Sequence, residues 1–160
     1  MIKHTSSPST LLSLVLLSWI LLMLAPLARA ATPDWMQSRS PHDVAVTMQR
    51  LERAVDGAGL KVFARIDHAA AAHKVGMKLR PTQLLIFGNP KAGTLLMQCS
   101  QTAGIDLPLK MLVWQDADGQ TWLGYTNPQA IAQRHGAADC AVVPKMRALM
   151  HKLMEQAAQN

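Results

Sequence analysis

The order of the predicted elements favours a single α+β domain with a mainly antiparallel sheet. Residues 60–67 alternate between apolar and polar side chains, which is typical of a strand with one face in the core. Residues 84–87 and 107–114 are almost entirely apolar, so both faces of these strands are expected to be covered. Apolar residues recur at helical spacing over residues 44–55 and 146–157. Several strands thus lie between two amphipathic helices, and we expect these helices to cover one face of the sheet.

The first 30 residues have the pattern of a secretory signal peptide. Lys3 precedes an almost wholly apolar run over residues 11–25, and Ala28 and Ala30 are small residues at the two positions that a signal peptidase reads. An uncleaved anchor is the alternative, but the run is shorter than the roughly 20 residues of a membrane helix. We therefore expect cleavage after Ala30 or one residue later, with residues 31–160 forming one domain.

Export would place a mildly basic chain in the periplasm or the extracellular space. Removing residues 1–30 removes two basic residues and no acidic one, so 14 basic and 10 acidic residues leave a net charge of +4. These charges are scattered, and the sequence has no basic stripe with interleaved aromatic residues, so nucleic-acid binding is not expected. No second apolar run is long enough to cross a bilayer, so no stable membrane span is expected after cleavage.

The N-terminal part of the domain is expected to contain a strand, a helix and another strand. Residues 35–40 form the first predicted strand. Ser40 and Pro41 suit the N-cap and the first position of the following helix, which Gly57 and Gly59 end.

The strand over residues 60–67 is expected to direct one set of its side chains to the core, namely Leu60, Val62, Ala64 and Ile66. Asp67 is placed to cap a short alanine-rich helix, which Gly76 ends. The strand over residues 84–87 follows.

Asn89 and Pro90 supply an N-cap and a first position for a helix directly after that strand. One face of this helix is expected to carry Ala92, Leu95, Leu96 and Cys99, and Gly104 is expected to close it.

The C-terminal part is expected to be a hairpin followed by helices. Asp116–Gly119 has the composition of a hairpin turn between the strands over residues 107–114 and 121–126. Asn127-Pro128 then begins a helical turn that Gly136 ends, and the last predicted helix follows.

The two cysteines, Cys99 and Cys140, are the candidates for one disulfide. An exported protein is in a compartment where disulfides persist, and an even count permits a single bridge. Two buried thiols are the alternative. Neither cysteine has a second cysteine or a histidine at ligand spacing, so a metal site is not expected.

The strands that are apolar on both faces predict an additional contact surface. If the helices pack in one layer, they cover one face of the sheet and leave apolar surface on the other. A second subunit is the simplest cover for that surface, so a homodimer is expected.

Four motifs agree in order and spacing with a known family: Phe63–His68 (FARIDH), Phe87–Pro90 (FGNP) with Gly93, Asp106–Leu109 (DLPL) and Tyr125–Pro128 (YTNP). They resemble the domain of unknown function family 302, over about residues 40–136, with the last helix continuing to residue 160. The resemblance implies a two-layer β-α-β(4)-α fold and a homodimer. It implies no catalytic residues.

The segment Gly88–Thr94 has the glycine spacing of a phosphate-binding loop, but Thr94 stands where that loop requires lysine, so nucleotide hydrolysis is not expected. A helix N-terminus at Asn89 with Lys91 nearby can still hold an anion. The alternative is that Asn89 is simply a cap and Lys91 simply solvated.

Histidine spacing gives no metal site. His68 and His73 are five residues apart and would lie on different faces of a helix, and the other histidines are distant in sequence. His68 remains a candidate ligand-binding residue, with a hydrogen-bonded loop histidine as its alternative.

Lys110 interrupts an apolar strand, and a buried lysine needs a partner, for which Asp67 is a candidate. The alternative is a lysine that extends to solvent at the sheet edge. Asp106 enters the same strand through its Asp-Leu-Pro-Leu turn.

The sequence thus favours an exported, non-enzymatic, dimeric binding module, with a small anion as one candidate ligand and no cofactor. Its pocket is expected near Gly88–Gly93 and Asp106–Lys110, using five candidate residues: His68, Asn89, Lys91, Asp106 and Lys110. One competing hypothesis is a small enzyme with acid and base groups from Asp67, His68, Asp106 and Lys110. A structural or protein-interaction domain is the other.

Overall fold

The computed structural model describes residues 33–159, so the predicted signal peptide lies outside the described residues. The elements follow in the order β1 Trp35–Ser40, α2 Val44–Gly57, β2 Lys61–Asp67, α3 His68–Lys74, β3 Thr82–Gly88, α4 Pro90–Cys99, the 3-10 helix η1 Gln101–Ile105, β4 Lys110–Gln115, β5 Thr121–Thr126, α5 Pro128–Arg134 and α6 Val143–Ala158. Within this part of the chain, no helix is both long enough and apolar enough to cross a membrane.

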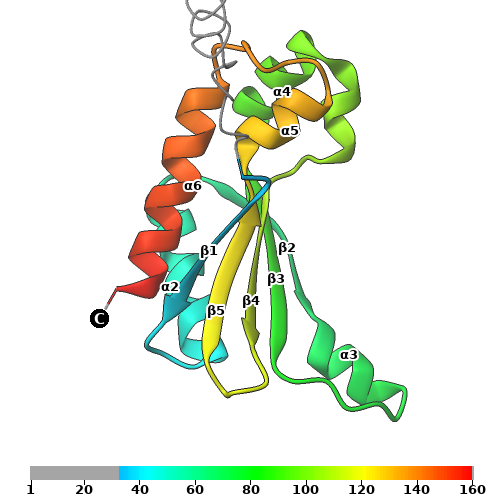
Figure 1. Ribbon diagram of the computed structural model, residues 1–160, viewed down its shortest axis with the longest axis vertical. Coiled ribbons are helices and arrows are strands. Elements are labelled where there is room, and N and C mark those ends of the chain that lie inside the picture. The colour runs from blue at the N-terminus through cyan, green and yellow to red at the C-terminus, as the bar shows by residue number, and fades with distance from the viewer. Residues whose placement is uncertain (1–32, 160) are drawn as a thin grey trace, which may run out of the picture. The chain divides into compact units, whose positions relative to one another are not determined.

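The five strands form one antiparallel sheet in the order β1-β5-β4-β3-β2. Helices α2 and α6 pack against each other and against the same face of this sheet (Figure 1). Helices α4 and α5 lie beyond one end of the strands, and α3 lies beyond the other. The predicted α+β class, with a mainly antiparallel sheet and its helical layer on one face, is confirmed.

The core lies between the sheet and the helical layer. Alternate strand residues supply one side, including Leu85, Phe87, Met111, Val113 and Leu123, which are fully buried. Helices α2 and α6 supply the other side with Met48, Leu51, Val55, Met150 and Leu153. Each large side chain of this kind stabilises the fold by roughly 1.5–3 kcal/mol when fully buried.

The opposite face of the sheet is also largely apolar. Strand pairing aligns Leu84 with Leu112 and Trp114 with Trp122, and these side chains are half-buried. The ring of Trp114 lies between those of Trp35 and Trp122, with centroid distances of 6.1 and 6.4 Å. This surface, which we call the tryptophan face, is opposite the face that α2 and α6 cover, because its residues alternate along the strands with the buried core residues.

Two predicted features of the N-terminal half were wrong. Asp43, and not Ser40, is the N-cap of α2, since its carboxylate accepts a hydrogen bond from Val46 N. The Ser40 hydroxyl instead forms a hydrogen bond of 2.7 Å with the Thr47 hydroxyl. This bond links the last residue of β1 to helix α2.

Strand β2 does not bury one face as its alternation predicted. It is an edge strand without a buried residue, and Val62 and Ile66 are 41% and 38% exposed. The register of β2 against β3 also shifts between Val62 and Ala64. Side chains before and after this irregularity therefore do not alternate regularly between the two faces of the sheet. The cap by Asp67 is confirmed, because its carboxylate accepts from Ala70 N.

The helix after Asn89 is shorter than predicted. Helix α4 ends at Cys99, and Ser100 takes an extended conformation before η1 begins. Gly104 therefore lies within η1 and does not close α4.

Candidate functional site

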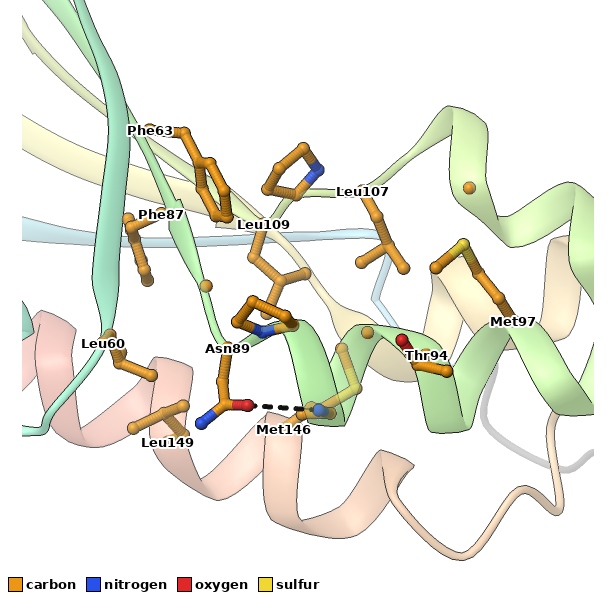
Figure 2. Close-up of a pocket in the computed structure, with 16 residues that line it drawn as sticks. Leu60, Phe63, Phe87, Asn89, Thr94, Met97, Leu107, Leu109, Met146 and Leu149 are labelled. Carbon is orange, nitrogen blue, oxygen red and sulfur yellow. Dashed lines mark hydrogen bonds between the residues drawn. The ribbon is translucent and has the colours of Figure 1, made fainter.

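A cavity of about 290 Å³ opens where α4 leaves the sheet (Figure 2). Five segments form it: the start of β2, the end of β3, α4, the connection from η1 to β4, and α6. Its position matches the predicted location between residues 88–93 and 106–110. We call it the apolar pocket, because its walls are mainly apolar side chains, such as Leu60, Phe63, Met97, Leu107, Met146 and Leu149.

The local sequence explains how α4 borders this pocket. Asn89 is the N-cap, with Oδ1 accepting from Lys91 N at 2.9 Å and from Ala92 N at 3.4 Å, and Pro90 occupies the first turn. Both expectations for this helix start are confirmed. Because Asn89 occupies two N–H groups of the first turn, fewer of them are left to hold an anion.

The two lysines predicted for an anion site do not line the pocket. Lys91 is exposed on α4. Lys110 is half-buried and pairs with Ile86, so its side chain is on the tryptophan face of the sheet. The structure therefore does not bring the two cations together around Asn89.

Asp106 faces a polar cluster that the sequence did not indicate. Its Oδ2 lies 2.8 Å from His135 Nε2 and accepts from Arg134 Nη1 at 3.0 Å. Arg134 also reaches Asp34, and His135 Nδ1 lies 3.0 Å from the Thr102 hydroxyl. These contacts join η1, α5 and the segment before β1, so the cluster has a clear structural role.

The charges around Asp106 alter its titration. Burial on its own would raise the pKa of this carboxyl group, but the hydrogen bond with His135 and the charge of Arg134 outweigh burial and hold the pKa below its usual value. Asp106 is thus an ionised partner in an ion-pair network and does not line the apolar pocket.

His68 and Asp67 lie at the other end of the sheet. His68 is the exposed first residue of α3. Hydrogen bonds from Ala70 N and from the Gln83 side chain lower the pKa of Asp67, despite the opposing effect of burial. Asp67 pairs across from Gln83 at the start of β3, whereas Lys110 pairs near its end. The acid and base groups of the enzyme hypothesis are therefore not gathered into one site.

The predicted disulfide is confirmed. Cys99 and Cys140 are bonded, with a Cα–Cα distance of 6.1 Å and a separation of 41 residues. The bond links the last residue of α4 to the segment that precedes α6. Among the described residues, no group of three or more His, Cys, Asp or Glu side chains could hold a metal ion.

Signals for the apolar pocket were only partly present in the sequence. The Phe-Gly-Asn-Pro and Asp-Leu-Pro-Leu segments marked its position. Its lining by Met146 and Leu149 depends on how α6 packs, and helical periodicity assigned these two residues simply to the core.

Comparison with curated proteins gives partial matches. Fluoride-specific ion channel FluC 1 of Brucella suis is 43% identical over 110 residues, which are 69% of this chain and 43% of that protein. Fluoride-specific ion channel FluC 2 of Brucella melitensis is also 43% identical over 110 residues, or 41% of its length. The chain thus spans about two fifths of the length of these curated relatives.

The fold is shared with a solved structure. The crystal structure of an uncharacterized conserved protein DUF302 from Bacillus stearothermophilus matches with a TM-score of 0.71 at 17% identity, covering 79% of this chain and 99% of that one. A family model described as domain of unknown function DUF302 matches residues 36–157. Since this match covers most of the sequence and agrees with the fold, the chain belongs to the DUF302 family.

Proposed function

We propose that this protein is a non-enzymatic binding module whose apolar pocket takes a small apolar ligand or the apolar part of a larger one. The observation that carries the proposal is the cavity of about 290 Å³ with almost entirely apolar walls. Small-molecule sites are concave, mainly apolar and supplied with a few polar groups. Here Asn89 and Thr94 are the polar side chains at the wall.

An apolar ligand suits these walls better than the small anion considered from the sequence. Transfer of apolar surface from water into such a pocket contributes roughly 25 cal/mol for each Å² that is buried. An anion would lose hydration there without gaining a charged partner, because neither Lys91 nor Lys110 lines the wall.

Binding of the apolar fluorescent probe N-phenyl-1-naphthylamine tests this function. The probe should gain fluorescence on mixing with the protein, and Gly93→Leu should abolish the gain. A Cβ at Gly93 would meet Leu107 Cδ1 at 3.7 Å, which is ordinary contact, and the rest of the leucine would fill the pocket.

Gly57→Leu is the matched control, since a Cβ there has no heavy atom within 4 Å. It should leave the fluorescence gain unchanged. Equal fluorescence with wild-type protein and Gly93→Leu would show that the probe does not use this pocket.

Two further properties belong to the proposal. The module acts in the periplasm or outside the cell, a location supported by the signal-peptide pattern of residues 1–30. It is also a homodimer, and the tryptophan face supports this assembly because a second subunit would cover its partly exposed apolar side chains.

The curated relatives favour a second candidate function, participation in fluoride handling. It is supported by 43% identity over 110 residues to proteins named as fluoride-specific ion channels. Calorimetric titration with sodium fluoride, and with sodium chloride as the matched salt, tests whether this domain binds the ion itself. Identical heats for the two salts would exclude a fluoride-selective site in the chain.

A further inference from the structure

A second cavity, of about 330 Å³, lies against a different face of α6 and has another chemical character. It is lined by Met36, Tyr125, Asn127, Pro144, Arg147, Ala148 and His151. It shares no lining residue with the apolar pocket, which α6 borders through Met146 and Leu149.

Tyr125 brings an available hydroxyl group to this cavity. The residue is only 3% exposed, and its hydroxyl has no hydrogen-bond partner among the described residues. Within the same part of the chain, Arg50 Nε is the only fully buried side-chain nitrogen or oxygen without a partner. Tyr125 lines the cavity, so its hydroxyl group is a candidate hydrogen-bond partner for a molecule bound there.

The electrostatics keep this hydroxyl protonated. Burial raises the pKa of Tyr125 above its usual value, the charge of Arg147 opposes this rise, and Glu155 adds to it. A protonated phenol at neutral pH can donate a hydrogen bond to an acceptor in the cavity.

Arg147 gives the cavity a positive charge, and His151 lies beside it on α6. They are four residues apart on α6 and therefore lie on one helical face. Arg147 has no ion pair among the described residues. His151 Nδ1 lies 3.4 Å from Glu155 Oε2, and its Nε2 has no hydrogen-bond partner in the same part of the chain. Among the described residues that line the cavity, none carries a carboxylate.

Asn127 forms a fixed wall. Its Nδ2 donates to Pro33 O at 3.1 Å, and its Oδ1 accepts from Gln129 N at 3.0 Å, so its side-chain amide is held in place. Met36, Pro144 and Ala148 supply the apolar part of the lining.

We propose that this cavity binds an organic anion, with its carboxylate or phosphate group between the Arg147 guanidinium and the Tyr125 hydroxyl. A guanidinium group presents two parallel N–H donors that match these oxyanions. The apolar body of the ligand packs against Met36, Pro144 and Ala148. The site is independent of the apolar pocket, so it stands whether or not that pocket holds a ligand.

Titration followed by NMR, with benzoate and phenyl phosphate as probes, tests the site. Both should shift the backbone signals of residues around Arg147 and should bind with dissociation constants in the millimolar range or lower. The probe that binds more tightly identifies the preferred charged group, carboxylate or phosphate. Acetate and inorganic phosphate, which lack an apolar body, should bind more weakly. Benzyl alcohol, which lacks the charge, should not bind.

Two variants separate specific binding from general attraction to a basic protein. Arg147→Gln should weaken binding by about tenfold to a hundredfold, and Tyr125→Phe by about tenfold, because each removes hydrogen bonds to a charged group. Arg53→Gln changes an exposed arginine on α2 away from the cavity and should bind as the wild type does.

Three results would overturn the proposal. The first is that neither aromatic anion shifts the backbone signals. The second is that wild type and Arg147→Gln bind the anions with equal affinity. The third is that Arg53→Gln loses as much affinity as Arg147→Gln does. Equal affinity for acetate and benzoate, and likewise for inorganic and phenyl phosphate, would exclude a role for the apolar wall.

Discussion

The indole ring of Trp35 lies over Gly124 on the neighbouring strand, in the space that a side chain at residue 124 would take. A Cβ at Gly124 would collide with ring atoms of Trp35 and approach Met36 O to 2.9 Å. The absence of a side chain at Gly124 thus leaves room for the Trp35 ring, which lies 6.1 Å from the Trp114 ring between centroids.

Gly124→Ala should therefore destabilise the protein by about 1–3 kcal/mol, because the methyl group displaces both a ring and the backbone of β1. Urea unfolding followed by tryptophan fluorescence measures the change. Gly57→Ala is the control, since a Cβ there meets nothing within 4 Å, and it should not destabilise. Unaltered stability of Gly124→Ala would mean that β1 adapts without cost.

Leu112→Lys should convert the proposed dimer to a monomer. Leu112 is on the tryptophan face, beside Leu84 and Gly124, and a stable interface of about 800 Å² on each partner tolerates a central unpaired charge poorly. Sedimentation equilibrium measures the mass. Val46→Lys, at an exposed site of α2, should remain a dimer. A dimer that survives Leu112→Lys would have to use another surface.

Removal of the Cys99–Cys140 bond should cost about 4 kcal/mol of unfolding free energy, as expected for a loop of 41 residues. Replacement of both cysteines by alanine, and reduction of the wild-type protein, should lower the urea midpoint to a similar degree. Reductant should not affect the double variant. An unchanged midpoint after complete reduction, verified by thiol titration, would contradict the prediction.

Asp106 should contribute stability that depends on pH. Its pKa is lower in the folded protein than the value near 3.9 of an unfolded aspartate, so its contribution is complete above that value and is lost as pH falls through the folded pKa. Asp106→Asn should cost roughly 1–2 kcal/mol near neutral pH. The difference from the wild type should shrink in strong acid.

The matched control for this variant is Asp139→Asn, which changes an exposed aspartate without a hydrogen-bond partner among the described residues. It should change stability by less than about 0.5 kcal/mol at any pH. Thermal unfolding from neutral to strongly acidic pH measures both variants. A deficit in Asp106→Asn that persists in acid would show that its ion pairs do not cause it.

The elements that could be predicted from the sequence are those with local signals. Asn89-Pro90 and Asn127-Pro128 each place a capping side chain directly before a residue suited to the first turn, and both start helices. Strand β2 was predicted correctly as a strand, but its core-facing side was not, because its register and its irregularity after Val62 depend on pairing with β3. Alternation predicts two faces, but it does not predict that an edge strand leaves both exposed.

The sequence marked two segments beside the apolar pocket, but it did not indicate the contacts of the polar residues in them. The turns around Asn89 and Asp106 lie near the apolar pocket, but Asp106 itself bonds to His135, which is 29 residues later in the chain. No local pattern connects these two residues, because the packing of α5 against η1 brings them together. For the same reason the sequence did not indicate that Tyr125 and Arg147 share a cavity.

The disulfide also limits how far two walls of the apolar pocket can move apart. It fastens the end of α4 to the chain before α6, so these two walls cannot easily move apart. Phe63 and Pro108 flank Gly88 at the other side of the pocket, and Phe63 is 44% exposed. Rotation of one exposed aromatic side chain takes nanoseconds or less, whereas separation of packed helices takes microseconds or more. Entry past Phe63 would therefore give rapid exchange without any loosening of the fold.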